Sequence, residues 1–470
     1  MKAIKHILVF FIFGLVLASS VSCKEKSSSR KNSFTSSSEV NEMSKPPSKP
    51  DGNGGDGAPP GGGFGGGHAS ANIDYSGATE ISSAKVFSDK TYSTDTVDQS
   101  ALLVSTKDSV QITNVTVTKT GDSDGGDSCN FYGLNAAVLV KDGSTTTITG
   151  GTVSSSASGA NGVFCYGGNG GKNGGEGDGT TVIISDVTIT TTGDGSGGIM
   201  TTGGGITKAS NLTVTTSGRS SAAIRTDRGG GTVTVDGGTY TSNGLGSPAI
   251  YSTADITVSN ATLVSNLSEG VCIEGKNTIT LNNCSLTASN TKRNGKATFL
   301  DTIMIYQSMS GDADSGTSCF TMNGGKLTSK SGHMFHVTNT NAIINLDKVE
   351  LVNEGSDILL SVCDDGWSGA SNIATVNATN QKLVGTILVG SGSTLTLNLS
   401  GSSTFTGSIS GNIENASGQT VSSDTGTVNV SLDETSIWTL TADTYISSFT
   451  GNTSNVKTNG YKLYVNGKAL

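Results

Sequence analysis

Short stretches in which apolar and polar residues alternate recur along the chain from about residue 75 onwards. Clear examples are Val110–Val117, Val182–Ile189, Val233–Tyr240 and Ile256–Leu263. Val, Ile or Leu holds alternate positions and Thr often stands between them, which is the pattern of a strand with one buried face. An Asn, Asp or Gly corner divides each stretch, and these residues tolerate the left-handed backbone of a sharp turn. Each stretch therefore predicts two short strands joined by a tight turn.

A further short apolar strand lies between successive stretches, as at Ala222–Arg225, Pro248–Tyr251, Val271–Glu274 and Ile303–Tyr306. In the most regular part of the chain the whole pattern repeats about every 21 to 23 residues, which is too short for a four-stranded propeller blade. The Leu spacing and the helical half of a leucine-rich repeat are absent. A coil of two or three short strands fits, because stacked coils bury their apolar faces on one another. We predict an all-β chain whose residues 68–470 form a parallel β-helix of about a dozen coils; an array of β-sandwiches is the alternative.

The first residues have the form of an export signal. Two lysines precede an apolar run, Ile7–Ala18, that is shorter than a comfortable membrane span. The sequence Ser-Val-Ser-Cys at positions 20–23 resembles the bacterial lipobox, although Ser20 stands where that motif favours Leu. The resemblance implies that residues 1–22 are a signal peptide and that Cys23 is diacylated. An ordinary secretory signal is the alternative.

The segment 23–67 is rich in Ser, Lys, Pro and Gly and has too few apolar residues to form a core. Such a composition is typical of a solvated tether. No later segment is long and apolar enough to span a bilayer. We therefore expect an exported protein that is anchored to a bacterial membrane by its lipid and displayed at the cell surface.

The composition supports strands and restricts the partners. Thr, Ser, Asn and Gly are abundant, which favours strands with tight turns over helices. The formal net charge is −9, from 29 Lys and Arg against 38 Asp and Glu. This negative charge argues against nucleic acid as a partner and leaves neutral polysaccharides, proteins and cations.

Six cysteines follow the candidate lipidation site, and an even number in an exported chain allows either disulfides or buried single thiols. They are Cys129, Cys165, Cys272, Cys284, Cys319 and Cys363. Because no pair has the Cys-x-x-Cys spacing, a zinc knuckle is not expected.

The repeat over roughly residues 75–470 resembles the right-handed parallel β-helix superfamily, and in particular bacterial surface proteins of that fold that act as adhesins or carbohydrate-binding proteins. Pectate lyases and polygalacturonases share the fold, so the resemblance implies a fold and leaves the function open. A lyase would need an Arg or Lys base beside carboxylates that hold a cation. Arg225, Asp227 and Arg228 are residues of those types, but the catalytic motifs of both enzyme families are not found.

Acidic, Gly-rich loops interrupt the repeat, and insertions in solenoids often gather on one binding face. Two of these loops carry pairs of carboxylates, Asp312 with Asp314 and Asp364 with Asp365. Ca²⁺ takes six to eight oxygen ligands, so these four residues are candidate ligands for a calcium cofactor. Their spacing does not match an EF-hand, and solvated turns are the alternative.

Large polar residues follow inward-facing Ile residues in the strands that lie between the stretches. Arg225, Tyr251, Glu274 and Tyr306 hold this position and are expected to point outward from neighbouring coils. Since rungs rise by about 4.8 Å, the four would form an exposed row that suits a sugar chain through stacking and hydrogen bonds. A solvated face without a ligand is the alternative.

These features favour a cell-surface lipoprotein that binds a glycan or another host or matrix component and has no enzymatic activity. One rival is a lyase or hydrolase that acts on an acidic polysaccharide. Another is a passive spacer with no ligand. The lack of a recognisable catalytic set separates the first hypothesis from the enzyme, whereas the sequence does not separate it from the spacer.

Overall fold

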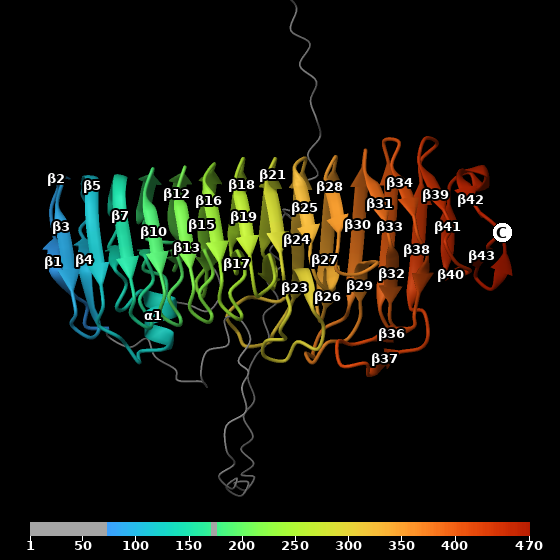
Figure 1. Cartoon of the computed structure of the whole chain (residues 1–470), viewed down its shortest axis with the longest axis horizontal. Helices are drawn as coiled ribbons and strands as arrows, with labels where there is room; N and C mark the ends of the chain where they lie inside the picture. Colours follow the sequence, from blue (N-terminus) through green and yellow to red (C-terminus); the bar gives the residue numbers. More distant parts are fainter. Residues whose placement is uncertain (1–72, 171–175) are drawn as a thin grey trace, which may run out of the picture. The chain divides into compact units, whose positions relative to one another are not determined.

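The chain forms a parallel β-helix in a computed structural model that describes residues 73–170 and 176–470 (Figure 1). Its strands stack into a sheet of 13 strands and a sheet of 22 strands. The predicted all-β solenoid is confirmed. Within the described ranges, no helix is both long and apolar enough to cross a membrane. The predicted signal peptide, Cys23 and the tether up to residue 67 lie outside the described residues.

One coil from the regular part shows how the sequence makes the fold. β14 (Ile224–Thr226) belongs to the 13-stranded sheet, while β15 (Gly231–Asp236) and β16 (Thr239–Ser242) belong to the 22-stranded sheet. Along β15, exposed Thr alternates with buried Val, as the pattern of the sequence predicts. Gly237 and Gly238 join β15 to β16 with φ angles of 71° and 92°.

Asparagine takes the place of glycine at the same corner in other coils. Asn211, Asn260 and Asn283 have φ angles of 52°, 56° and 52°. The side-chain amide of Asn260 donates a hydrogen bond of 2.7 Å to the carboxylate of Asp236, which lies at the end of β15 in the preceding coil. These corners therefore turn the chain and also link successive coils.

The strands of the 13-stranded sheet pair in parallel along the axis. They are β1 (Ser76–Ile81), β4 (Gln99–Ser105), β6 (Val138–Lys141), β8 (Val163–Tyr166), β11 (Ile199–Thr202), β14, β17 (Ile250–Ser252), β20 (Val271–Glu274), β23 (Asp301–Tyr306), β26 (His333–Thr338), β29 (Ile358–Val362), β32 (Thr386–Val389) and β35 (Ile409–Ser410).

The 22-stranded sheet carries the two strands on either side of the left-handed corner. Besides β15 and β16 it contains β2 (Lys85–Ser88), β3 (Thr91–Thr94), β5 (Ser109–Lys119), β7 (Thr145–Ser155), β9 (Thr181–Ser185), β10 (Thr188–Thr191), β12 (Gly205–Ser210), β13 (Thr213–Thr216), β18 (Asp255–Ser259), β19 (Thr262–Ser265), β21 (Thr278–Asn282), β22 (Ser285–Ala288), β24 (Thr317–Asn323), β25 (Lys326–Ser329), β27 (Asn341–Asp347), β28 (Glu350–Asn353), β30 (Ile373–Thr379), β33 (Thr394–Ser400), β38 (Thr427–Leu432) and β41 (Ser448–Thr450).

Smaller sheets complete the C-terminal coils. They consist of β31 (Lys382–Val384), β34 (Thr404–Thr406), β39 (Ile437–Thr439) and β42 (Val456–Lys457); of the antiparallel pair β36 (Ile413–Glu414) and β37 (Thr420–Ser422); and of β40 (Thr444–Ile446), β43 (Leu463–Val465) and β44 (Lys468–Ala469), with a short 3-10 helix at Thr453–Asn455.

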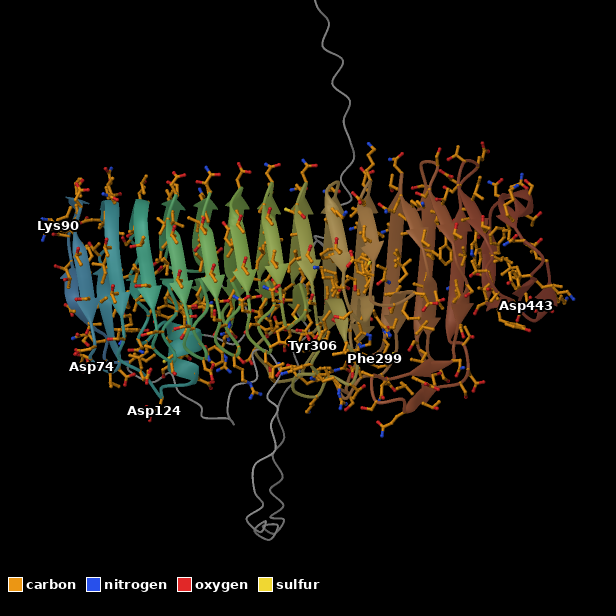
Figure 2. All side chains as sticks on the ribbon, viewed as in Figure 1. Asp74, Lys90, Asp124, Phe299, Tyr306 and Asp443 are labelled. Carbon is orange, nitrogen blue, oxygen red and sulfur yellow. The ribbon has the colours of Figure 1, made fainter. Side chains whose placement is uncertain are left out.

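The 13-stranded sheet is buried on both of its faces in the middle of the solenoid, since every residue of β17, β20 and β23 is buried. The inner face packs on the core of the solenoid. The outer face is covered by α1 (Asp127–Tyr132) and by loops that project from one side of the coils (Figure 1). Figure 2 shows Tyr306 close to these loops.

Five of the cysteines are free and buried in the described chain. They are Cys129, Cys165, Cys272, Cys284 and Cys363. These five cysteines are therefore buried single thiols and do not form disulfides.

The left-handed corner can be tested at Asn260. We expect Asn260→Val to lower the free energy of unfolding by about 1–2 kcal/mol more than Asn260→Gly, because a β-branched residue is strained at a positive φ and glycine is not. Both variants lose the hydrogen bond to Asp236, so the difference isolates the backbone. Urea denaturation measures it, and equal stabilities of the two variants would contradict the left-handed corner.

Candidate functional site

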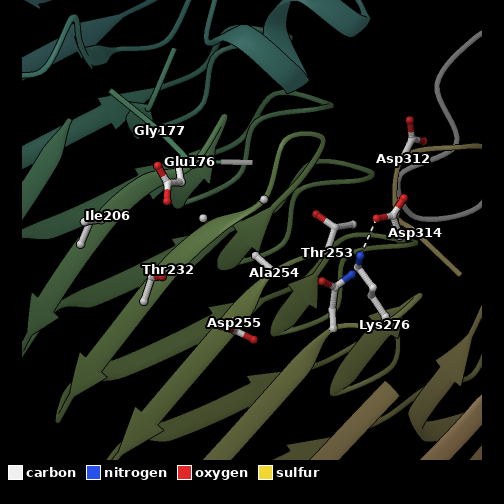
Figure 3. A pocket seen from close by; sticks show the side chains of 15 residues that line it. Glu176, Gly177, Ile206, Thr232, Thr253, Ala254, Asp255, Lys276, Asp312 and Asp314 are labelled. Carbon is white, nitrogen blue, oxygen red and sulfur yellow. Dashed lines mark ion pairs between the residues drawn. The ribbon is translucent and has the colours of Figure 1, made fainter. Parts of the chain in front are cut away.

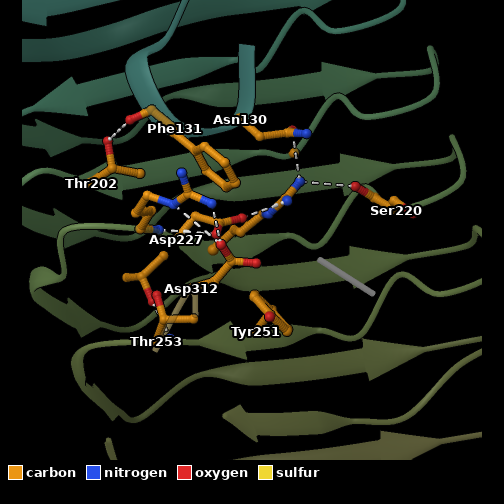
Figure 4. A network of polar contacts seen from close by, with 12 residues as sticks. Asn130, Phe131, Thr202, Ser220, Asp227, Tyr251, Thr253 and Asp312 are labelled. Atoms are coloured by element: carbon orange, nitrogen blue, oxygen red, sulfur yellow. Dashed lines mark hydrogen bonds and ion pairs between the residues drawn. The ribbon is translucent and has the colours of Figure 1, made fainter. Parts of the chain in front are cut away.

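Two arginines beside the outer face of the 13-stranded sheet are each held by a carboxylate (Figure 4). The guanidinium of Arg225 lies 2.7 Å from the carboxylate of Asp227, and that of Arg228 lies 2.6 Å from Asp312. Arg228 also lies over the ring of Phe131 in α1, 4.0 Å from the ring centre. This network joins α1, the corner after β14 and the loop 307–316.

A second set of contacts centres on Glu274, at the end of β20. One of its carboxylate oxygens accepts hydrogen bonds from the hydroxyls of Tyr251, at 2.6 Å, and Tyr306, at 3.1 Å. The other oxygen accepts one from Ser308 in the loop 307–316. Burial raises the pKa of Glu274, and the hydrogen bonds from Ser308 and Tyr251 oppose that rise. These bonds fasten the loop to the sheet.

The prediction that four large polar side chains form an exposed row is wrong. Arg225, Tyr251, Glu274 and Tyr306 are 3%, 1%, 2% and 0% exposed. Both tyrosines belong to a cluster separate from the main core, between the sheet and its covering loops. A direct contact of these four residues with a ligand stays a prediction, and their burial gives them a structural role in holding the loops.

The register of the strands also breaks the expected row. Tyr251 pairs with Cys272 and not with Glu274, because Ile250 stacks on Val271. Val271 and Ile273 both belong to the core. Either residue could therefore stack on Ile250. The expected row assumes Ile273, whereas the structure has Val271, and this difference displaces Glu274 by two residues from Tyr251 along the strand.

The first pair of candidate calcium ligands is occupied by basic side chains. Asp312 is bound to Arg228, and Asp314 lies 2.6 Å from the ammonium group of Lys276. Over the described residues, no group of three His, Cys, Asp or Glu side chains is arranged to hold a metal ion. A calcium cofactor stays a prediction, and its binding here would have to displace these ion pairs.

The second pair of candidate calcium ligands lies in a different network. The carboxylate of Asp365 lies 3.2 Å from Nε2 of His336, and Nδ1 of His336 lies 2.7 Å from the hydroxyl of Ser361. The order Asp-His-Ser would activate a serine in a hydrolase, but these three side chains are at most 1% exposed. Asp364 instead accepts a hydrogen bond from Asn372. This buried network is not among the sites predicted from the sequence.

The residues considered for a lyase are engaged with one another or with the covering loop. The side chain of Arg225 is 4% exposed and that of Asp227 is fully buried. Burial raises the pKa of Asp227 to about 7, and the charge of Arg225 opposes the rise. With Arg228 bound to Asp312, neither arginine is presented as an exposed base.

An open hollow of about 380 Å³ lies next to these networks, at the corner between the two large sheets (Figure 3). The hollow is lined by one residue after each of four successive strands of the 13-stranded sheet: Gly204 after β11, Gly230 after β14, Ala254 after β17 and Asn277 after β20. Because rungs rise by about 4.8 Å, the hollow follows the axis over a distance of roughly 14 Å. An extended chain could lie along it.

Charged and hydroxyl groups form the walls of the hollow. Lys276 and its partner Asp314 stand on one side, and Asp255 and Thr232 of the 22-stranded sheet stand on the other (Figure 3). Thr253 also lines the hollow, and its hydroxyl is buried without a hydrogen-bond partner in the described chain. The arrangement can bind a polar, extended ligand through several hydrogen bonds at once.

The hollow is not among the sites predicted from the sequence, although a signal for it exists. Two runs of three glycines, 203–205 and 229–231, occur at the same place in neighbouring coils. At Gly230 the backbone has a φ of 66°, which glycine adopts without strain. At Gly231 a side chain would meet the backbone of Gly205 in the neighbouring coil, so glycine here lets successive coils approach closely.

The buried Glu274 predicts a pH dependence of stability. Because its folded pKa is raised, its contribution to stability is fully present below its ordinary pKa of about 4.5 and is lost as the pH rises through the raised value. Glu274→Gln removes this titration. Its melting temperature should therefore fall less than that of the wild type between about pH 4.5 and about pH 8.

The control for this prediction is Glu354→Gln, since Glu354 is exposed. Its melting curve should follow the wild type at every pH. Parallel pH profiles for Glu274→Gln and the wild type would contradict the raised pKa.

Comparisons of the chain with protein-family models, with curated proteins and with solved structures return no match.

Proposed function

We propose that this protein is a cell-surface lipoprotein that binds a glycan, without catalysis, along the hollow at the corner of its β-helix. The hollow is the observation that supports the proposal: it crosses four coils, and glycines, alanines and several polar side chains line it. An extended polymer with repeated hydroxyl groups suits such a site, because the coils repeat the same geometry along the axis.

Ion pairs and hydrogen bonds hold one wall of the hollow in place without a ligand. Asp312 is held by Arg228, Asp314 by Lys276, and the loop that carries both aspartates is fastened to Glu274 through Ser308. Groups that are fixed in advance lose less conformational entropy when a ligand binds. This preorganisation favours a binding site over a merely solvated surface.

An enzyme that cleaves acidic polysaccharide is a weaker candidate for this site. Two carboxylates without an ion pair in the described chain, Glu176 and Asp255, line the hollow and would repel a polyanion. Arg225, the proposed base, is buried and bound to Asp227. The experiments below distinguish glycan binding from both the enzyme and a passive spacer.

The anchor can be tested on protein extracted from membranes. The position of Cys23 after an apolar run and small residues predicts a diacylated N-terminal cysteine. Mass spectrometry of the mature N-terminus decides it. Protein released into the medium with an unmodified Cys23 would contradict the proposed anchoring.

The hollow can be tested by placing a large side chain in it. We expect the full chain to retain specific glycans on an array, and we expect Thr232→Tyr to weaken that binding by about tenfold or more, because the ring would occupy the hollow. Thr234→Tyr is the matched control, since Thr234 is exposed on the same strand and does not line the hollow. Its affinity should equal that of the wild type.

Two outcomes would overturn this proposal. If the wild type retains no glycan and releases no unsaturated sugar product, the spacer is left as the explanation. If Thr232→Tyr and Thr234→Tyr bind equally well, the ligand does not occupy the hollow.

A further inference from the structure

We infer that the hollow selects glycans with free amino groups, so that its ligand is a cationic hexosamine chain and not a neutral or acidic polysaccharide. This inference rests on the proposed function and names the class of ligand for the same site. It is based on the charges in the hollow and on one buried hydroxyl group.

The charges that line the hollow do not balance. Of its four carboxylates, Asp312 and Asp314 are paired with Arg228 and Lys276. The other two, Glu176 and Asp255, are exposed and form no ion pair within the described residues. Both side chains are drawn among the lining residues in Figure 3. The hollow therefore presents two negative charges for which the described chain supplies no cation.

An ammonium group on the ligand would complement these charges. It carries three donors and no acceptor, and its hydrogen bonds to carboxylates are stronger than those between neutral groups. An acetylated amine has lost the positive charge, and a uronic acid adds a negative charge that the two carboxylates repel. Electrostatic complementarity thus favours the free amine over both alternatives.

Thr253 gives independent support for a ligand in the hollow. Its side chain lines the site, the residue is only 5% exposed, and its hydroxyl oxygen has no hydrogen-bond partner in the described chain. A buried hydroxyl without a partner is unfavourable. A polar group of a bound sugar at this wall would supply the missing partner.

The test measures the affinity of the full chain for three oligosaccharides of equal length, built from glucosamine, N-acetylglucosamine and galacturonic acid, by isothermal titration calorimetry. We expect the glucosamine oligomer to bind most tightly and its affinity to fall as salt is added. Asp255→Asn and Glu176→Gln should each weaken its binding by up to about fivefold. The exposed Glu354→Gln, remote in sequence from the lining residues, should have no effect.

Thr253→Val provides a second readout that a purely structural role would not give. The change replaces the unpartnered hydroxyl by a methyl group, so we expect glucosamine binding to weaken by about three- to tenfold while the melting temperature stays the same or rises. Weaker binding together with a lower melting temperature would instead indicate damage to the fold and would count against this contact.

The outcomes separate this inference from the proposed function. If N-acetylglucosamine or galacturonic acid oligomers bind as tightly as glucosamine oligomers, the charge selection is wrong, and sensitivity of that binding to Thr232→Tyr would still support glycan binding in the hollow. If none of the three oligomers binds, the inference of a hexosamine ligand is overturned, and the glycan array alone decides the proposed function.

Discussion

The structure depends on the need to cover the outer face of its 13-stranded sheet. Stacked coils bury the inner face of every strand on the core of the solenoid, but β17, β20 and β23 carry large apolar and aromatic side chains on their outer face as well. Leaving that face in water would expose a continuous apolar patch. The chain buries it beneath loops that leave the coils, which contribute Ala297 and Trp367 to the same cluster (Figure 1).

Covering this face with loops brings polar groups out of water, and these groups need partners. Arg225 with Asp227 and Arg228 with Asp312 supply such partners (Figure 4). The hydroxyl donors of Glu274 supply others. The ion pair of Asp312 and the hydrogen bond from Ser308 to Glu274 also hold the covering loop 307–316 in place. The hollow lies at the neighbouring corner, beside the loop that the ion pairs of Asp312 and Asp314 hold. The candidate site is thus a consequence of how the sheet is covered.

Much of the fold could be predicted from the sequence because a parallel β-helix is encoded locally. The alternation of Val and Thr within β15 and the left-handed Asn260 each reflect the chemistry of a few neighbouring residues. The cover could not be predicted in this way. Arg228 and Asp312 are 84 residues apart, and they meet only after the coils between them have stacked.

The exposure of the predicted row was mispredicted for a physical reason that the sequence partly reveals. Tyr251 and Glu274 were assigned to a solvated face on the rule that strands alternate between core and water. The unbroken apolar run Ile303–Ile305 before Tyr306 is instead typical of a strand that is buried on both faces. Such a strand predicts a covered sheet. A ligand site is then expected away from this face, at the corner where the glycine runs lie.

Nitration of tyrosines in the native protein, followed by mass spectrometry of its peptides, tests the covered sheet most directly. Tyr251 and Tyr306 are at most 1% exposed, whereas Tyr445 and Tyr461 are 53% and 41% exposed. The account predicts rapid modification of Tyr445 and Tyr461, with Tyr251 and Tyr306 protected until the protein unfolds. Modification of Tyr251 and Tyr306 at the rate of Tyr445 would contradict it and would restore an exposed row of side chains on this face.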